Sequence, residues 1–180
     1  MPGRARVPML GLVTFATSNH PFVIKSGDGR DTPIGQLTTV HKLPEHLADG
    51  RLAIVEHVLP PWQLAAPLHR HSREDELSFV LAGQLGARLG DEVVLAGPAT
   101  YVFKPRGQWH TFWNAGSAEL RFIEVLIPGG VEGYFTRLSQ LLSARRAPTA
   151  GELQSLASEY GIEFDFDSIA PLCDQFGLRF

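Results

Sequence analysis

Between residues 22 and 128 the apolar positions fall into short runs separated by glycine, proline and aspartate. Short runs of this kind, rich in β-branched and aromatic residues, predict β-strands, and no helical period of useful length occurs there. Gly90-Asp91, between two of the runs, predicts a tight hairpin turn. The predicted strands are residues 21–25, 37–43, 52–59, 77–82, 84–89, 92–95, 101–104, 110–114 and 119–127. Many short strands at close spacing favour a mainly β fold, a sandwich or barrel, over alternating βαβ units.

After residue 130 the hydrophobic period becomes helical. A first helix presents one apolar face made of Val131, Tyr134, Phe135, Leu138 and Leu142. Thr149 and Glu152 have the spacing of a capping box at the start of a second helix. The apolar stripe of this second helix is Leu153, Leu156, Ala157 and Tyr160, with Gly161 at its end.

A last short helix is expected to begin at Asp167 or Ser168 and to stop at Gly177. These C-terminal helices have too little apolar surface to form a domain alone, so we expect them to pack outside the barrel or at a subunit contact. The expected organisation is an N-terminal arm over residues 1–20, a β-barrel over 21–128 and a helical extension over 129–180.

Composition narrows the classes of function. The chain has 180 residues, 44% hydrophobic and 19% charged, which is an ordinary globular balance. The net charge of -3 gives no reason to expect nucleic acid as a partner. Cys173 is the only cysteine, so an internal disulfide and a thiolate metal cluster are excluded, in agreement with the cytoplasmic location that we expect.

No apolar run reaches the ~18 residues of a membrane-spanning helix, and we expect no membrane partner. Arg4 and Arg6 precede a mildly apolar stretch that loosely imitates a signal peptide. Pro8 and Gly11 interrupt that stretch, so we expect an N-terminal arm instead.

The histidines near the middle of the chain carry the candidate chemistry. His69 and His71 are two residues apart, so on a strand they share one face and can converge on one ion. Glu76 begins the next strand-like run, and His110 begins another that could face them across a barrel. Three imidazoles and a carboxylate suit Fe(II), Mn(II), Ni(II), Zn(II) or Cu(II), with poor discrimination among them.

The wider spacing resembles the cupin superfamily. The first cupin motif, G-x5-H-x-H-x3or4-E-x6-G, corresponds to Gln63-x5-His69-x-His71-x4-Glu76-x6-Gly83. The second, G-x5-P-x-G-x2-H-x3-N, corresponds to Ala99-x5-Pro105-x-Gly107-x2-His110-x3-Asn114. The chain departs from both motifs at the leading glycine, which is Gln63 in one and Ala99 in the other, and we expect this to change loop shape more than ligation.

The resemblance implies a double-stranded β-helix barrel with one divalent metal near one end. It implies that His69, His71, Glu76 and His110 are the ligands, and the distance to the closing glycine selects Glu76 over Glu74. We expect Glu74 and its neighbour Asp75 to be exposed loop charges.

Strand alternation extends the candidate site to pocket residues. Ser78 and Val80 should share the face of Glu76, and Phe112 and Asn114 that of His110. Phe112 could be the wall of a substrate pocket or simple barrel core.

The remaining aromatic and basic residues are assigned to other roles. We expect Trp109 and Trp113 to pack beneath the helices or in an interface, and Arg106 to be a solvated turn charge. His20, His41 and His57 receive structural or surface roles.

Three functions share the same ion. The first is an Fe(II) or Mn(II) dioxygenase acting on a small phenolic or enolic substrate, as in small cupins that cleave flavonol-type compounds, with Glu76 bound to the metal or acting as a base. The second is a non-oxidative isomerase or cyclase that uses the ion as a Lewis acid. The third is a module that binds a small molecule without turnover. The resemblance also leads us to expect a homodimer formed through edge strands, for which the β-rich segment before Leu52 offers material.

Overall fold

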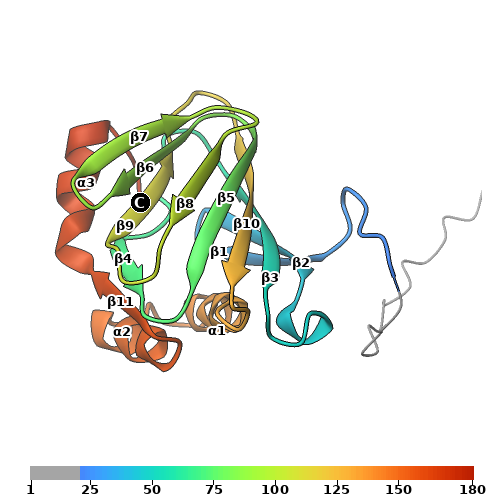
Figure 1. Cartoon of the computed structure of the whole chain (residues 1–180). Coiled ribbons are helices and arrows are strands. Elements are labelled where there is room, and N and C mark those ends of the chain that lie inside the picture. Colours follow the sequence, from blue (N-terminus) through green and yellow to red (C-terminus); the bar gives the residue numbers. More distant parts are fainter. Residues whose placement is uncertain (1–20) are drawn as a thin grey trace, which may run out of the picture.

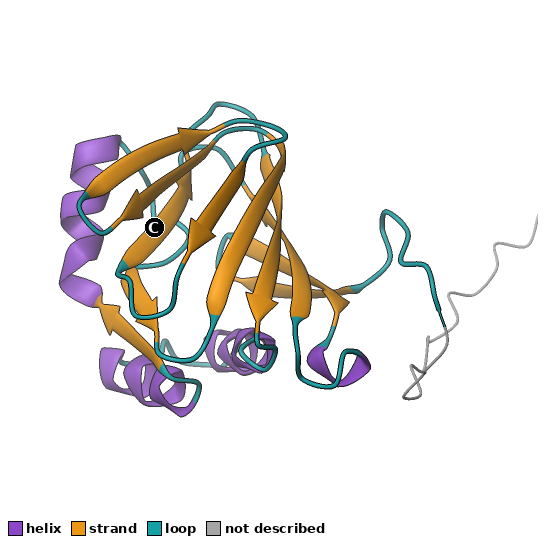
Figure 2. Ribbon diagram, in the orientation of Figure 1, coloured by secondary structure: helices purple, strands orange, loops and turns teal. Residues whose placement is uncertain are grey.

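The computed structural model describes residues 21–180 as a β-barrel made of two antiparallel sheets, with helices at its periphery (Figures 1 and 2). The six-stranded sheet has the order β1-β2-β3-β10-β5-β8, and the five-stranded sheet the order β11-β4-β9-β6-β7. The strands are β1 (Arg30–Ile34), β2 (Leu37–Leu43), β3 (Ala53–Leu59), β4 (Leu68–His71), β5 (Asp75–Ala82), β6 (Leu85–Leu89), β7 (Glu92–Ala96), β8 (Tyr101–Lys104), β9 (His110–Asn114), β10 (Leu120–Ile127) and β11 (Ile162–Asp165). The expected mainly β class, with C-terminal helices, is confirmed.

Most strands form where the sequence alternates between residues that face the barrel and residues that face away from it. β5 and β10 show the strict inside–outside alternation of a sheet with one buried face. The hairpin between β6 and β7 pairs Leu89 with Glu92, which leaves Gly90-Asp91 as its two-residue turn, as predicted.

Two predictions at the margins of the barrel differ from the structure. Residues 21–25 form no strand; the first strand is instead β1, which pairs only with β2. Pro33 lies within β1, and an edge strand tolerates proline because its N–H side need not be paired. β11 was also missed, since it has only four residues and follows directly on the glycine that ends a helix.

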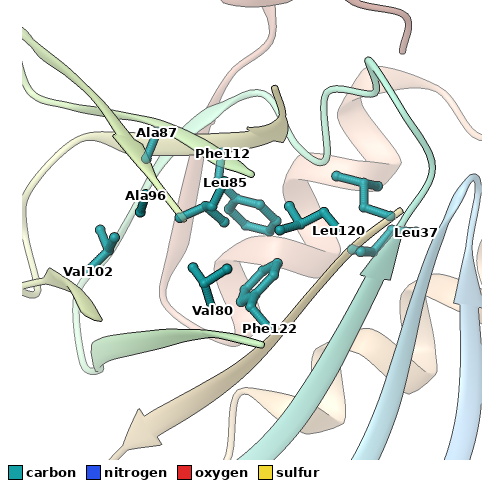
Figure 3. Packing of buried hydrophobic residues seen from close by; sticks show 10 residues of the cluster. Leu37, Val80, Leu85, Ala87, Ala96, Val102, Phe112, Leu120 and Phe122 are labelled. Atoms are coloured by element: carbon teal, nitrogen blue, oxygen red, sulfur yellow. The ribbon is translucent and has the colours of Figure 1, made fainter. Parts of the chain in front are cut away.

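One part of the barrel interior is a hydrophobic core. Side chains from both sheets meet there, with Phe112 and Phe122 packed edge to face at 5.2 Å between ring centroids (Figure 3). The core residues are Leu37, Leu59, Val80, Leu85, Ala87, Ala96, Val102, Phe112, Leu120 and Phe122. Phe112, left open between core and pocket wall, is thus part of the core.

Helices α1 (Glu132–Leu142) and α2 (Ala150–Glu159) lie together at one end of the barrel (Figure 1). They share a second hydrophobic cluster with the barrel, made of Ala53, Val55, Leu126, Val131, Tyr134, Leu156, Ala157 and Ile162. The predicted capping box of α2 is present. Leu142 is 38% exposed, whereas its neighbour Leu141 packs against the cluster, so the apolar face of α1 ends one residue earlier than predicted.

Short 3-10 turns, Glu45–Leu47 and Phe166–Ser168, complete the elements together with α3 (Ile169–Phe176). α3 ends at Gly177 in the left-handed conformation, as predicted, and packs on the outside of the five-stranded sheet (Figure 1). Across residues 21–180 no helix is long and apolar enough to span a bilayer. The arm expected for residues 1–20, with His20, lies outside the described residues.

Candidate metal centre

The four predicted ligands lie together inside the barrel, and they come from both sheets. His69 and His71 point inward from β4, and His110 is the direct partner of His69 on β9. Glu76 reaches them from β5 of the opposite sheet. One potential ligand atom of each residue lies within 4.8 Å of all the others, and all four side chains are buried.

Two of the three imidazole rings are oriented by a backbone carbonyl that accepts a hydrogen bond from their outer nitrogen. Nδ1 of His69 donates to the Pro67 carbonyl oxygen at 2.9 Å, and Nδ1 of His110 donates to that of Gln108 at 2.9 Å. With the hydrogen on Nδ1, a neutral ring carries its available lone pair on Nε2. The Nε2 atoms of His71 and His110 lie 3.2 and 3.1 Å from the two oxygens of Glu76.

These residues fit a divalent metal ion by two observations. The Nε2 atoms of His71 and His110 and the Oε2 atom of Glu76 are buried without a hydrogen-bond partner, which is costly unless something else binds them. The two nitrogen–oxygen distances also match the about 3.0–3.4 Å expected between neighbouring ligands that each lie about 2.1 Å from one ion. We infer that the donor set is suited to hold such an ion.

Charge and burial shift the pKa values of the site in different directions. Burial, reinforced by the neighbouring His110 and His71, holds the pKa of His69 well below its usual range. Burial opposes the charged forms of His71 and Glu76 as well, but their mutual attraction and the nearby Lys104 and Glu74 outweigh it. The pKa of His71 is therefore raised and that of Glu76 lowered.

Glu74 differs from its predicted role as an exposed loop charge. Its side chain is buried, and its Oε2 lies 3.5 Å from Nδ1 of His71. Glu74 thus lies beside the outer nitrogen of His71 at ion-pair distance, where the other two imidazoles have a backbone carbonyl, but the two atoms do not form a hydrogen bond. The prediction was wrong because position in a loop says little about whether the loop folds over a site. Asp75, by contrast, is only partly buried and pairs with exposed Arg106 at 2.7 Å.

Two buried charges next to the site carry no sequence motif and were not predicted. Lys104, at the end of β8, places Nζ 2.9 Å from Oε2 of Glu76 and 2.8 Å from Oε2 of Glu124 on β10. Lys104 and Glu124 are each 1% exposed. The available signal was their inward position in the strand alternation, since a lysine and a glutamate at buried strand positions need partners.

With these residues included, the region holds three buried carboxyl groups: Glu76 and Glu124, which contact the Lys104 ammonium, and Glu74, which lies beside His71.

The four predicted pocket residues have separate surroundings. Ser78 lies inside the barrel and donates to Glu124, whereas Val80 belongs to the hydrophobic core. The Asn114 amide donates to the carbonyls of Leu59 and Ala118 and accepts from the backbone N–H of residue 116. Its hydrogen bonds therefore hold the end of the barrel strands together.

An aromatic ring from the C-terminal extension also lines the site. Phe164 on β11 lies opposite His69 in the strand register, and the ring centroids are 5.4 Å apart. The ring of the core residue Phe112 has its centroid 5.1 Å from Nζ of Lys104. Aromatic rings from β9 and β11 thus lie next to the buried polar groups.

Both of the other strand histidines are buried. His57 contacts Oγ1 of Thr39 through Nδ1 at 3.0 Å, and burial lowers its pKa to about 3. His41 is buried on β2.

Trp113 packs beneath a helix, as expected. Trp113 stacks on Phe176 of α3 with the ring centroids 4.5 Å apart. Trp109 instead packs against the guanidinium of Arg70.

The glycine positions of the two motifs differ in how strictly they require glycine. Gly83 has φ +78° and a Cβ there would lie 2.5 Å from the Glu119 carbonyl oxygen, so only glycine fits. Ala99 occupies a glycine position of the second motif and keeps the left-handed conformation, with φ +63°. The turn geometry is therefore retained with a side chain that disfavours it.

Comparison with known proteins agrees with this architecture. Residues 55–126 match the family model of the cupin domain. A predicted oxalate decarboxylase from Thermotoga maritima is 23% identical over 59% of this chain and 99% of its own, with a TM-score of 0.56. The polyketide cyclase RemF from Streptomyces resistomycificus is 24% identical over 60% of this chain and 80% of its own, with a TM-score of 0.52.

A protein with a double-stranded β-helix domain from Klebsiella pneumoniae subsp. pneumoniae is 19% identical over 63% of this chain and 93% of its own, with a TM-score of 0.50. No curated protein matches the chain. Similarity at these identities concerns the fold, and the named activities differ from one structure to the next. Residues 55–126 thus match the cupin domain, and residues 21–180 have the barrel fold of the cupin structures to which they are similar.

Proposed function

We propose that the protein is a metal-dependent enzyme whose ion is held by His69, His71, Glu76 and His110. The observation that carries the proposal is the convergence of three imidazoles and one carboxylate on a buried point, where Nε2 of His71, Nε2 of His110 and Oε2 of Glu76 have no hydrogen-bond partner. A bound divalent ion would supply Lewis acidity and open coordination positions for a substrate oxygen.

The reaction we favour is dioxygenation of a small phenolic or enolic substrate, with Fe(II) or Mn(II) as the native ion. The donor set of nitrogen and oxygen ligands suits these ions. Phe164 beside His69 and Phe112 beside Lys104 would pack against a planar substrate. Glu76 would accept the proton of the substrate hydroxyl, since it is the carboxylate closest to the imidazole nitrogens.

A second candidate is a non-oxidative isomerase or cyclase, the class of the structurally similar polyketide cyclase. The observation that favours it is the buried pair of Glu124 and Lys104 beside Glu76. Burial raises the pKa of Glu124 to about 7, against the opposing effect of Lys104. A carboxyl group that titrates near neutral pH suits proton transfer within a substrate.

Elemental analysis of anaerobically purified protein tests the metal centre. Wild type should carry about one equivalent of a divalent transition metal, and His69→Ala and Glu76→Ala should carry much less. His46→Ala is the matched control, because His46 is exposed on a turn away from the barrel interior. Equally low metal in wild type and the ligand variants would overturn the proposal.

Oxygen consumption then separates the candidate reactions. Iron-loaded protein should consume O2 in the presence of candidate phenols if it is a dioxygenase. Conversion of a substrate without O2 consumption would favour the isomerase or cyclase. Tight binding of a small molecule without turnover under any metal would contradict both and indicate a binding module.

We also propose that the protein acts as a homodimer. β1 and β8 are edge strands of the six-stranded sheet, and the outward side chains Tyr101 and Phe103 of β8 are more than half exposed. Exposed apolar side chains at a strand edge favour pairing between copies. Sedimentation as a monomer at micromolar concentration would contradict the proposal.

A further inference from the structure

Lys104 is a cation held inside the barrel between two carboxylates. Its Nζ lies 2.9 Å from the nearest oxygen of the metal-ligand candidate Glu76 and 2.8 Å from that of Glu124. Burying an ammonium is unfavourable unless its surroundings compensate the charge. Lys104 on β8 is the direct register partner of Glu76 on the neighbouring strand β5. Lys104 is therefore the cation best placed to affect that carboxylate.

The two contacts of Lys104 are not equivalent. Nζ donates a hydrogen bond to Oε2 of Glu124, whereas Oε2 of Glu76 has no hydrogen-bond partner despite its proximity. Oγ of Ser78 lies 3.0 and 3.2 Å from the two oxygens of Glu124, which fixes that carboxylate in place. The ammonium is therefore directed at Glu124 and only approaches Glu76.

This asymmetry matters because an ammonium and a metal ion would compete for the same oxygens. If Lys104 turned its hydrogen bond to Glu76, a divalent ion would have to break a charge-assisted bond to gain that ligand. With Lys104 directed at Glu124, the Glu76 oxygen keeps its lone pairs available. Glu124 also offsets the positive charge that would otherwise repel the ion.

We propose that Glu124, oriented by Ser78, keeps the hydrogen bond of Lys104 away from Glu76 and thereby sets the metal affinity of the site. Glu124 and Ser78 are positioning residues that act on the ligand set through Lys104. The inference rests on the proposed metal centre and adds a control element from β5, β8 and β10 to the four ligands.

The test is a competition titration of Zn²⁺ between the protein and a chromophoric chelator, which needs no substrate. Glu124→Gln should bind Zn²⁺ about 10- to 100-fold more weakly than wild type, the range typical of residues that support metal ligands. Adding Lys104→Met to that variant should restore the affinity to within about 3-fold of wild type, because the competing ammonium is gone. Lys104→Met alone should bind at least as tightly as wild type.

The single lysine variant separates this role from that of a simple support for Glu76. If Lys104 only braced the carboxylate, Lys104→Met would lose affinity and the double variant would be weaker still. Glu163→Gln is the matched control: it removes one carboxylate from β11, where Glu163 pairs with Arg70 on the exposed side, and should leave the affinity unchanged.

Ser78→Ala covers the case in which Glu124→Gln does not fold. It removes only the hydroxyl that orients Glu124 and should weaken Zn²⁺ binding in the same direction by a smaller factor. Wild-type affinity in Glu124→Gln and Ser78→Ala, or no recovery in the double variant, would overturn the inference while leaving the metal centre intact. Absence of Zn²⁺ binding by wild type would overturn the metal centre itself.

Discussion

At the scale of single residues, Ala99 keeps a conformation that suits glycine better. Its φ of +63° lies in the left-handed region, and its backbone N–H donates to the Val80 carbonyl, which fixes the turn before β8. The Cβ atom makes this conformation unfavourable.

Ala99→Gly should therefore stabilise the protein by about 0.5–1 kcal/mol, as measured by urea unfolding. Ala118→Gly, in an exposed loop where φ is not positive, is the control and should destabilise slightly. Equal loss in both variants would show that the turn at residue 99 is not strained.

His57 is a buried imidazole whose protonation opposes folding. Burial, together with Lys104, lowers its pKa to about 3 from the usual 6.5. Because the folded-state pKa is the lower one, the unfolded chain binds the extra proton first as pH falls. The stability contributed by neutral His57 is complete above pH 6.5 and is lost progressively as the pH falls toward 3.

His57→Phe should make unfolding less sensitive to acid. Between pH 7 and 5 wild type should lose about 2 kcal/mol more than the variant, by linkage from the two pKa values. Phenylalanine fits the surroundings of this ring, which include Phe112, Phe122 and Phe135. Parallel pH profiles of the two proteins would contradict this account.

At the scale of elements, α2 is held by local chemistry visible in the sequence. The Glu152 N–H donates to Thr149 Oγ1 at 3.2 Å, and the Thr149 N–H donates to the Glu152 carboxylate at 2.9 Å. The first turn of the helix is thereby capped from both directions.

Thr149→Ala should lower the free energy of unfolding by about 1 kcal/mol in chemical denaturation. Ser155→Ala on the exposed side of the same helix is the matched control and should be neutral or slightly stabilising, because alanine has the higher helix propensity. A similar loss in both variants would argue against a specific role of the cap.

Sequence patterns gave the central strands and the helices because these elements carry local signals. β2, β8 and β9 match their predicted bounds, since their turns and alternation are set within a few residues. β1 and β11 depend on pairing with distant partners and have weak patterns of their own. The residues of the site differ in the same way. His69 and His71 could be predicted from their spacing in the sequence, whereas Lys104 and Glu124 are brought together only by strand register.

At the scale of the whole molecule, the candidate metal centre joins the two sheets. Glu76 belongs to the six-stranded sheet and the three histidines to the five-stranded sheet. A bound ion would therefore add a link between the two sheets, which also contact each other through side-chain packing and the hydrogen bond from Asn114 to the Leu59 carbonyl.

Metal loading should raise the melting temperature. At free metal 100-fold above the dissociation constant, binding to the folded state adds about 2.7 kcal/mol, or about 5–10 °C for a chain of this size. Calorimetry with Zn²⁺ and then with excess chelator measures the shift, and Glu76→Ala should show little of it. An equal shift in that variant would place the bound ion elsewhere.

The pairing of β11 with β4 decides how far this barrel can be shortened. Without β11, the four-residue strand β4, which carries His69 and His71, would be an edge strand of its sheet. It would then be paired only with β9, through a single residue pair. A minimal scaffold engineered from this chain, for example as a metal-responsive sensor, should therefore run from residue 30 to at least residue 165, well past the segment that matches the cupin domain. When the candidate metal site is transferred to another barrel, β11 should be transferred together with β4, the strand that carries His69 and His71.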